Sequence, residues 1–93
     1  MDLREAVAWI ARDDRGAADR LRLAANRAAV LIGQHAELGH VRPELAPERF
    51  RFYVLRAFPY VLVYETGLTP PRILRVLHGA RELAPLLADL SEL

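Results

Sequence analysis

The chain has 93 residues, 53% of them hydrophobic, so it is long enough for one folded domain and too apolar for a disordered segment. It has no cysteine, which excludes a disulfide framework and a thiolate zinc site. No apolar run approaches the roughly 18 residues that a membrane span needs, and Met1–Glu5 lacks signal-peptide character, so we expect a soluble cytoplasmic protein.

The net charge of +1 hides an uneven distribution of charge along the chain. Residues 49–81 carry six arginines against the single acid Glu65, a net charge of +5, whereas residues 82–93 carry three acids and no arginine. The six are Arg49, Arg51, Arg56, Arg72, Arg75 and Arg81. Every basic residue of the chain is arginine, which makes fixed bidentate contacts with carboxylates or phosphates and does not act as a general base. This middle region therefore predicts a binding surface.

Residues 1–34 predict a helical hairpin. Apolar residues at helical spacing over Leu3–Arg12 indicate one helix, and Trp9 lies beside its apolar stripe as a packing residue or part of a partner surface. Asp13-Asp14 supplies an N-cap for a second helix over Gly16–Gln34. Its expected buried stripe is Ala18, Leu21, Ala25, Ala28 and Ile32, widened by Leu23, Ala24, Val30 and Leu31.

Residues 33–47 predict a connection without a long regular element, because Gly39, Pro43 and Pro47 interrupt it. His35 and His40 bracket Glu37, but their spacing fits no standard metal site. We therefore expect neither a metal nor a cofactor.

Three strand-like runs follow. Arg49–Leu55 alternates, with Phe50, Phe52 and Val54 on one face. Tyr60–Tyr64 is apolar on both faces, as in a central strand, and Arg72–His78 is the third run. A helix is expected over residues 81–90, with Pro85 in its first turn and a stripe of Leu83, Leu86, Leu87 and Leu90.

The predicted fold is a single α+β domain over residues 1–93. The hairpin (1–34) packs on one face of a small antiparallel sheet of about three strands (49–78), and the C-terminal helix (81–90) follows.

Several motifs together resemble the RelE/ParE superfamily of toxins from bacterial type II toxin–antitoxin systems, and its ParE-like branch above all. The two most specific are Phe58–Tyr64 and Ile73–Arg81. The others are Asp2-Leu3, Ile10-Ala11, Ala17-Ala18, Glu37-Leu38-Gly39 with Arg42 and Glu44-Leu45, and Arg51. Family members usually begin with a strand before the first helix. Here helix follows Met1 at once, so we expect a missing, truncated or partner-supplied first strand and an uncovered sheet edge open to pairing.

The ParE resemblance implies a non-catalytic toxin that binds DNA gyrase and blocks replication. It also implies a hetero-oligomer with a small ParD-like antitoxin, whose acidic and apolar C-terminal tail wraps around the toxin. The candidate target- or antitoxin-binding residues are Arg49, Arg51, Arg56, Arg75, Arg81, Trp9, Leu87 and Leu90.

Two alternatives stay open. A ribosome-dependent mRNA endoribonuclease of the RelE type would use His78, Arg81, Arg75 and Arg51 as its catalytic candidates. The chain departs from that branch, since it has no lysine and Val61 falls where the central-strand arginine would be. Strand alternation also predicts Arg75 and His78 on opposite faces. The second alternative is an interaction domain that has lost toxicity.

Overall fold

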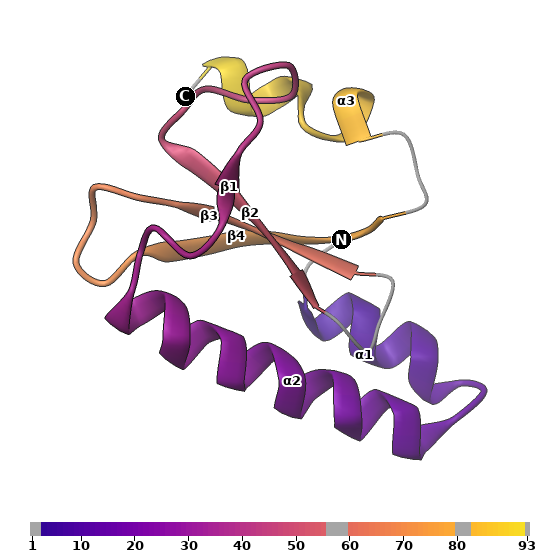
Figure 1. Cartoon of the computed structure of the whole chain (residues 1–93). Coiled ribbons are helices and arrows are strands. Elements are labelled where there is room, and N and C mark those ends of the chain that lie inside the picture. The colour runs from indigo at the N-terminus through magenta and orange to yellow at the C-terminus, as the bar shows by residue number, and fades with distance from the viewer. Residues whose placement is uncertain (1–2, 56–59, 80–82, 93) are drawn as a thin grey trace.

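A sheet lies between two sets of helices (Figure 1). The computed structural model describes residues 3–55, 60–79 and 83–92. The longer helices, α1 (Leu3–Ala11) and α2 (Arg15–Gln34), lie on one side of the sheet. The short helix α3 (Leu83–Leu86) and the 3-10 helix η1 (Ala88–Glu92) lie on the other. The predicted α+β class is confirmed.

The helical hairpin follows its sequence signals closely. The Asp14 side chain caps α2 by accepting a hydrogen bond of 3.1 Å from the backbone N–H of Ala17. The residues of α2 that are buried are the five of the predicted stripe: Ala18, Leu21, Ala25, Ala28 and Ile32.

The outer side of α2 departs from the prediction. Leu23, Val30 and Leu31 are 50%, 61% and 43% exposed, so the expectation that they widen the buried stripe is wrong. With about 3.6 residues per turn, Leu23 and Val30 point away from the buried stripe. The sheet covers only one side of α2, so these apolar side chains stay exposed among polar ones such as Arg20 and Arg27.

The sheet is an antiparallel meander in the order β1-β2-β3-β4. Its strands are β1 (His40–Val41), β2 (Phe50–Leu55), β3 (Tyr60–Glu65) and β4 (Arg72–His78). The first is additional to the three predicted, because a strand of two residues is too short to show alternation. The predicted central strand is confirmed: β3 pairs with neighbours on both sides and is buried from Tyr60 through Tyr64.

Both faces of the sheet are covered, whereas the sequence predicted helices over one. One core joins the helical hairpin to Leu55, Tyr60, Leu62, Tyr64 and Val76. The opposite core joins Leu83, Leu87 and Leu90 to Phe50, Phe52, Val61, Val63 and Leu77. A strand that is apolar on both faces, such as β3, requires this two-sided cover. Val54, expected beside Phe50 and Phe52, is 61% exposed, so the C-terminal cover does not reach this end of β2.

The C-terminal helix expected over residues 81–90 is two short pieces. The N–H of Leu87 bonds to the carbonyl of Ala84 at 3.2 Å, and the N–H of Leu90 to the carbonyl of Leu87 at 3.0 Å. These three-residue steps are 3-10 geometry. The segment is therefore not one regular α-helix. Residues 81 and 82 lie outside the described part of the chain.

The sheet ends at β4 on one side and at β1 on the other. Among the residues that the structure describes, β4 pairs with β3 alone, so its outer edge has no partner strand there. The same residues contain no helix with the length and apolarity needed to span a membrane.

Candidate functional site

The described arginines of residues 49–81 all have partners within the chain. Glu65 holds two of them: its Oε1 lies 2.8 Å from Nη2 of Arg72, and its Oε2 lies 3.5 Å from Nε of Arg49. The Arg49 guanidinium also lies over the ring of Phe50, 4.6 Å from its centroid. The one acid of this region therefore contacts two of its six arginines, although its single charge balances only one of them.

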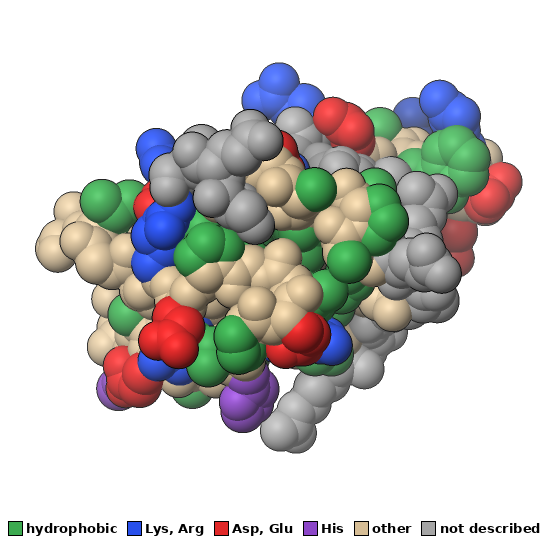
Figure 2. Space-filling model, turned by 90° about the horizontal axis from the view of Figure 1, so that it is seen from above, with side chains coloured by type: hydrophobic (Ala, Val, Ile, Leu, Met, Phe, Trp, Pro, Cys, Tyr) green, Lys and Arg blue, Asp and Glu red, His purple; other side chains and the backbone are tan. Residues whose placement is uncertain are grey.

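Arg75 pairs with Asp89, which joins β4 to η1. Asp89 belongs to the acidic C-terminal segment, so the basic and acidic parts of the sequence meet in space. The face on the α3–η1 side shows basic and acidic side chains interspersed among hydrophobic ones (Figure 2). The +5 charge of residues 49–81 is thus partly neutralised within the fold.

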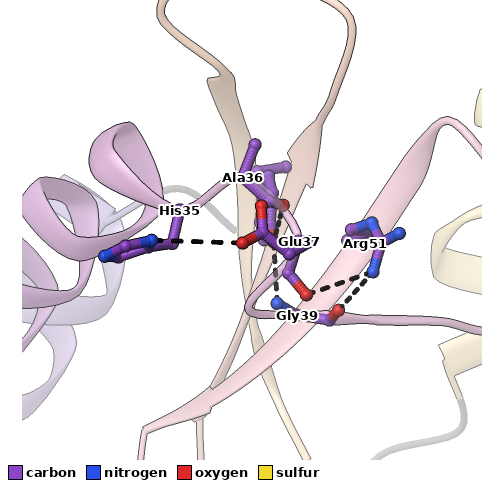
Figure 3. A network of polar contacts seen from close by, with 6 residues as sticks. His35, Ala36, Glu37, Gly39 and Arg51 are labelled. Atoms are coloured by element: carbon purple, nitrogen blue, oxygen red, sulfur yellow. Dashed lines mark hydrogen bonds and ion pairs between the residues drawn. The ribbon is translucent and has the colours of Figure 1, made fainter.

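Arg51 holds the connection that follows α2 (Figure 3). Its Nη1 donates to the carbonyls of Gly39 at 2.7 Å and Glu37 at 3.3 Å. The fully buried Tyr64 secures the same turn, because its hydroxyl donates to the Ala36 carbonyl at 2.6 Å and accepts from the Gly39 N–H at 2.8 Å. Arg51 therefore has a structural role that the sequence did not predict.

Gly39 is in the tightest position of this network. A Cβ atom there would lie 2.8 Å from Cε1 of Tyr64, 2.9 Å from its hydroxyl and 2.9 Å from the Phe52 carbonyl oxygen. The Glu37-Leu38-Gly39 motif therefore has a steric cause, since only glycine allows the chain to pass over the Tyr64 ring.

His35 and Glu37 lie close, with 4.0 Å between Nδ1 and Oε1, at the end of α2 (Figure 3). Across residues 3–55, 60–79 and 83–92, no three His, Asp or Glu side chains are placed to hold a metal ion.

The nuclease candidates do not converge. His78 is opposite Tyr60 in the β3–β4 register and meets its ring edge-on, with centroids 5.4 Å apart, on the helical-hairpin side. Arg75 is opposite Val63, on the α3–η1 side. The predicted opposite placement of His78 and Arg75 is confirmed, because paired residues of neighbouring strands share a face.

The third described nuclease candidate is also distant. Arg51 is opposite Tyr64, four residues along β3 from Tyr60, which corresponds to about 13 Å of strand. Arg56 and Arg81 lie outside the described residues.

The apolar candidates differ in accessibility. Trp9 is 58% exposed, and the Arg12 guanidinium lies 5.2 Å from its ring centroid. Leu87 and Leu90 are fully buried against the sheet. These two leucines, predicted as candidates for target or antitoxin contact, pack on the sheet in this structure.

Sequence reasoning missed a hollow between α1 and α2 that Arg4, Arg15 and Arg22 line. Arg15 and Arg22 are seven residues apart and so share a side of α2. This spacing was the available signal. Arg20 and Arg27 are also seven residues apart, so the spacing alone does not show which of the two arginine pairs lines the hollow.

The structure is thus that of a small α+β protein in which a helical hairpin packs on an antiparallel sheet rich in ion-paired arginines. Residues 1–83 match the family of the ParE toxin of the type II toxin–antitoxin system parDE. Because the match spans most of the chain, this protein belongs to the ParE toxin family. No curated protein and no solved structure matches the chain.

Proposed function

We propose that this toxin arrests growth without catalysis, by binding DNA gyrase in the cytoplasm, and that a cognate antitoxin neutralises it in a hetero-oligomer. Membership of the ParE toxin family supports the toxin role and implies an antitoxin partner. The gyrase target and the non-catalytic mode are the parts proposed here.

One observation carries the non-catalytic mode. General acid–base cleavage of RNA needs a base at the 2′-hydroxyl and cations at the phosphate within one small site. The described candidates for these roles occupy two faces of the sheet, with His78 on one and Arg75 on the other. Arg75 is also paired with Asp89, so it is not available to a phosphate without breaking that pair.

A supercoiling assay tests the gyrase target. Purified chain at micromolar concentration is expected to inhibit gyrase, and addition of the antitoxin encoded beside it is expected to restore activity. Unchanged supercoiling at that concentration would remove the gyrase proposal. Unaffected growth after induction without antitoxin would instead favour an interaction domain that has lost toxicity.

The endoribonuclease alternative depends on His78, which lies at the end of β4 beside Tyr60. A ribosome-dependent mRNA cleavage assay separates it from the gyrase proposal. We expect no cleavage by the wild-type chain. Cleavage that is lost in His78→Ala would establish the nuclease mechanism in place of the proposed one.

A further inference from the structure

A hollow of about 460 Å³ lies between α1 and α2, the two helices of the hairpin in Figure 1. The buried Val7 and Ala18 form its floor, and Ala8 and Ala11 line it on the α1 side. Sites for small molecules in proteins have volumes in this range and are mostly apolar, with a few polar groups that converge on the ligand. The hollow therefore has the size and the apolar lining of a site for a small ligand.

Three arginines and one acid supply the charged groups of the hollow. Arg4 comes from α1, and Arg15 and Arg22 come from α2, together with Asp19. Nη1 of Arg22 lies 3.9 Å from Oδ1 of Asp19. The exposed Arg4 and Arg15 have no ion-pair partner among the described residues. Two guanidinium groups, one from each helix, are therefore available to an anion that enters the hollow.

The net positive charge of the hairpin is concentrated at this hollow. Residues 3–34 carry six arginines against four acids, a net charge of +2. The hollow is lined by three of these arginines and one of these acids, so its own net charge is also +2. The other arginines and acids of the hairpin balance one another. A long nucleic acid needs a basic track along the surface, whereas charge collected at one hollow suits a compact anion.

We propose that the hollow binds a small phosphate-bearing molecule with an apolar or aromatic body, of the nucleoside diphosphate class. Its phosphates accept hydrogen bonds from Arg4 and Arg15, because the planar fork of a guanidinium group matches two phosphate oxygens. A diphosphate supplies the two or more negative charges that the hollow balances, and its body lies on the apolar floor. This site is additional to the proposed contact with gyrase and does not depend on it.

Titration of the purified chain with ADP tests the site. Trp9 is the only tryptophan of the chain, and it lines a neighbouring hollow that shares Ala8 with this one, so its emission reports on binding. Calorimetry in a phosphate-free buffer measures the affinity. We expect saturable binding of ADP, weaker binding of pyrophosphate, which has the charge without the body, and no binding of adenosine. No binding of ADP at millimolar concentration, or adenosine binding as tight as that of ADP, would overturn the proposal.

Two double variants locate the phosphate contacts. Arg4→Gln with Arg15→Gln is expected to weaken ADP binding about tenfold or more, because two charge-assisted contacts are lost. Both side chains are exposed and glutamine is a good helix former, so the fold is preserved. The matched control, Arg20→Gln with Arg27→Gln, removes the same charge from exposed residues of α2 that do not line the hollow. It is expected to change binding less than about twofold. Equal losses in the two double variants, or no loss in either, would overturn the proposal.

A further variant tests the apolar part of the site without changing any charge. Ala8→Leu introduces a larger side chain at an exposed position of α1, so it fills the hollow without disturbing the core. It is expected to weaken the binding of ADP several-fold and to leave the binding of pyrophosphate nearly unchanged. Unchanged binding of ADP would mean that its body lies outside the hollow, which would overturn the proposal.

Discussion

At the residue scale, the best-defined feature is the contact between Tyr64 and the turn after α2. The Tyr64 hydroxyl satisfies two backbone groups, a carbonyl at Ala36 and an N–H at Gly39. The Gly39 N–H would otherwise be buried without a partner, at a cost of about 1–3 kcal/mol. The β-sheet thereby fixes the path of the chain from α2 to β1, with Arg51 as a second support.

Gly39→Ala should lower the free energy of unfolding by about 1–3 kcal/mol, because the new methyl group meets Tyr64 and the Phe52 carbonyl. Urea denaturation measures this change. Gly33→Ala is the matched control, since no atom lies within 4 Å of its added Cβ and alanine is the better helix former there. Equal stability of Gly39→Ala and the wild-type chain would contradict the steric role of this glycine.

The Glu44 carboxyl gives a prediction for pH. A hydrogen bond from its own backbone amide, and then the Arg42 guanidinium 2.8 Å away, hold the pKa of Glu44 below its usual value. A pKa lowered by folding stabilises the fold above the unfolded value, and this contribution is lost as pH falls through the folded value. Arg42→Gln should therefore raise the pKa of Glu44 part of the way back, as an NMR titration of the carboxyl would record. An unchanged pKa would show that the backbone hydrogen bond alone causes the shift.

At the element scale, α2 is defined at its start by a cap and along its length by one buried stripe. The Asp14 side chain satisfies an N–H of the first turn, and its negative charge suits the helix N-terminus. The outer side of α2 receives no cover and still carries apolar residues such as Val30. A helix can thus show more apolar positions than its neighbours can bury.

Asp14→Ala should cost about 0.5–2 kcal/mol of stability, since it removes the cap of α2. Asp13→Ala is the matched control. It removes the same charge one residue earlier in the chain, and the Asp13 side chain caps no N–H in the described structure. Thermal unfolding followed by circular dichroism compares the two. Similar losses in both variants would mean that charge, and not the cap, stabilises this helix.

At the scale of the whole molecule, the chain has two cores that share one sheet. The hairpin core receives most of the helical residues, whereas the opposite core depends on a short C-terminal segment with Leu83, Leu87 and Leu90. The ion pair of Arg75 with Asp89 attaches the same segment to β4. Helices as short as α3 and η1 are not stable by local helix propensity alone. Packing of their leucines on the sheet therefore stabilises this segment.

Leu87→Ala should lower the free energy of unfolding by about 2–5 kcal/mol, because a fully buried leucine leaves a cavity over the sheet. Leu86→Ala removes the same atoms from a side chain that is 39% exposed, and its cost should be clearly smaller. Chemical denaturation of both variants measures the difference. If Leu86→Ala were the more damaging change, the orientation of the C-terminal segment would be wrong.

The sequence by itself determined the features that repeat along one element. The buried stripe of α2, its N-cap, the two-sided apolar strand at Tyr60–Tyr64 and the family motifs were all predicted. The opposite faces of Arg75 and His78 were predicted as well, because alternation is a local property of a strand.

Only the tertiary structure decided which distant residues meet. Tyr64 and Gly39 are 25 positions apart, and the partners of Arg72 and Arg75 are fixed by strand register and by the path of the C-terminal segment. Strand β1, the cover on the second sheet face and the hollow beside Arg4 and Arg15 also depend on packing between elements. The periodicity of apolar residues shows which residues share a face of one helix or strand. It carries no information on which other element packs against that face.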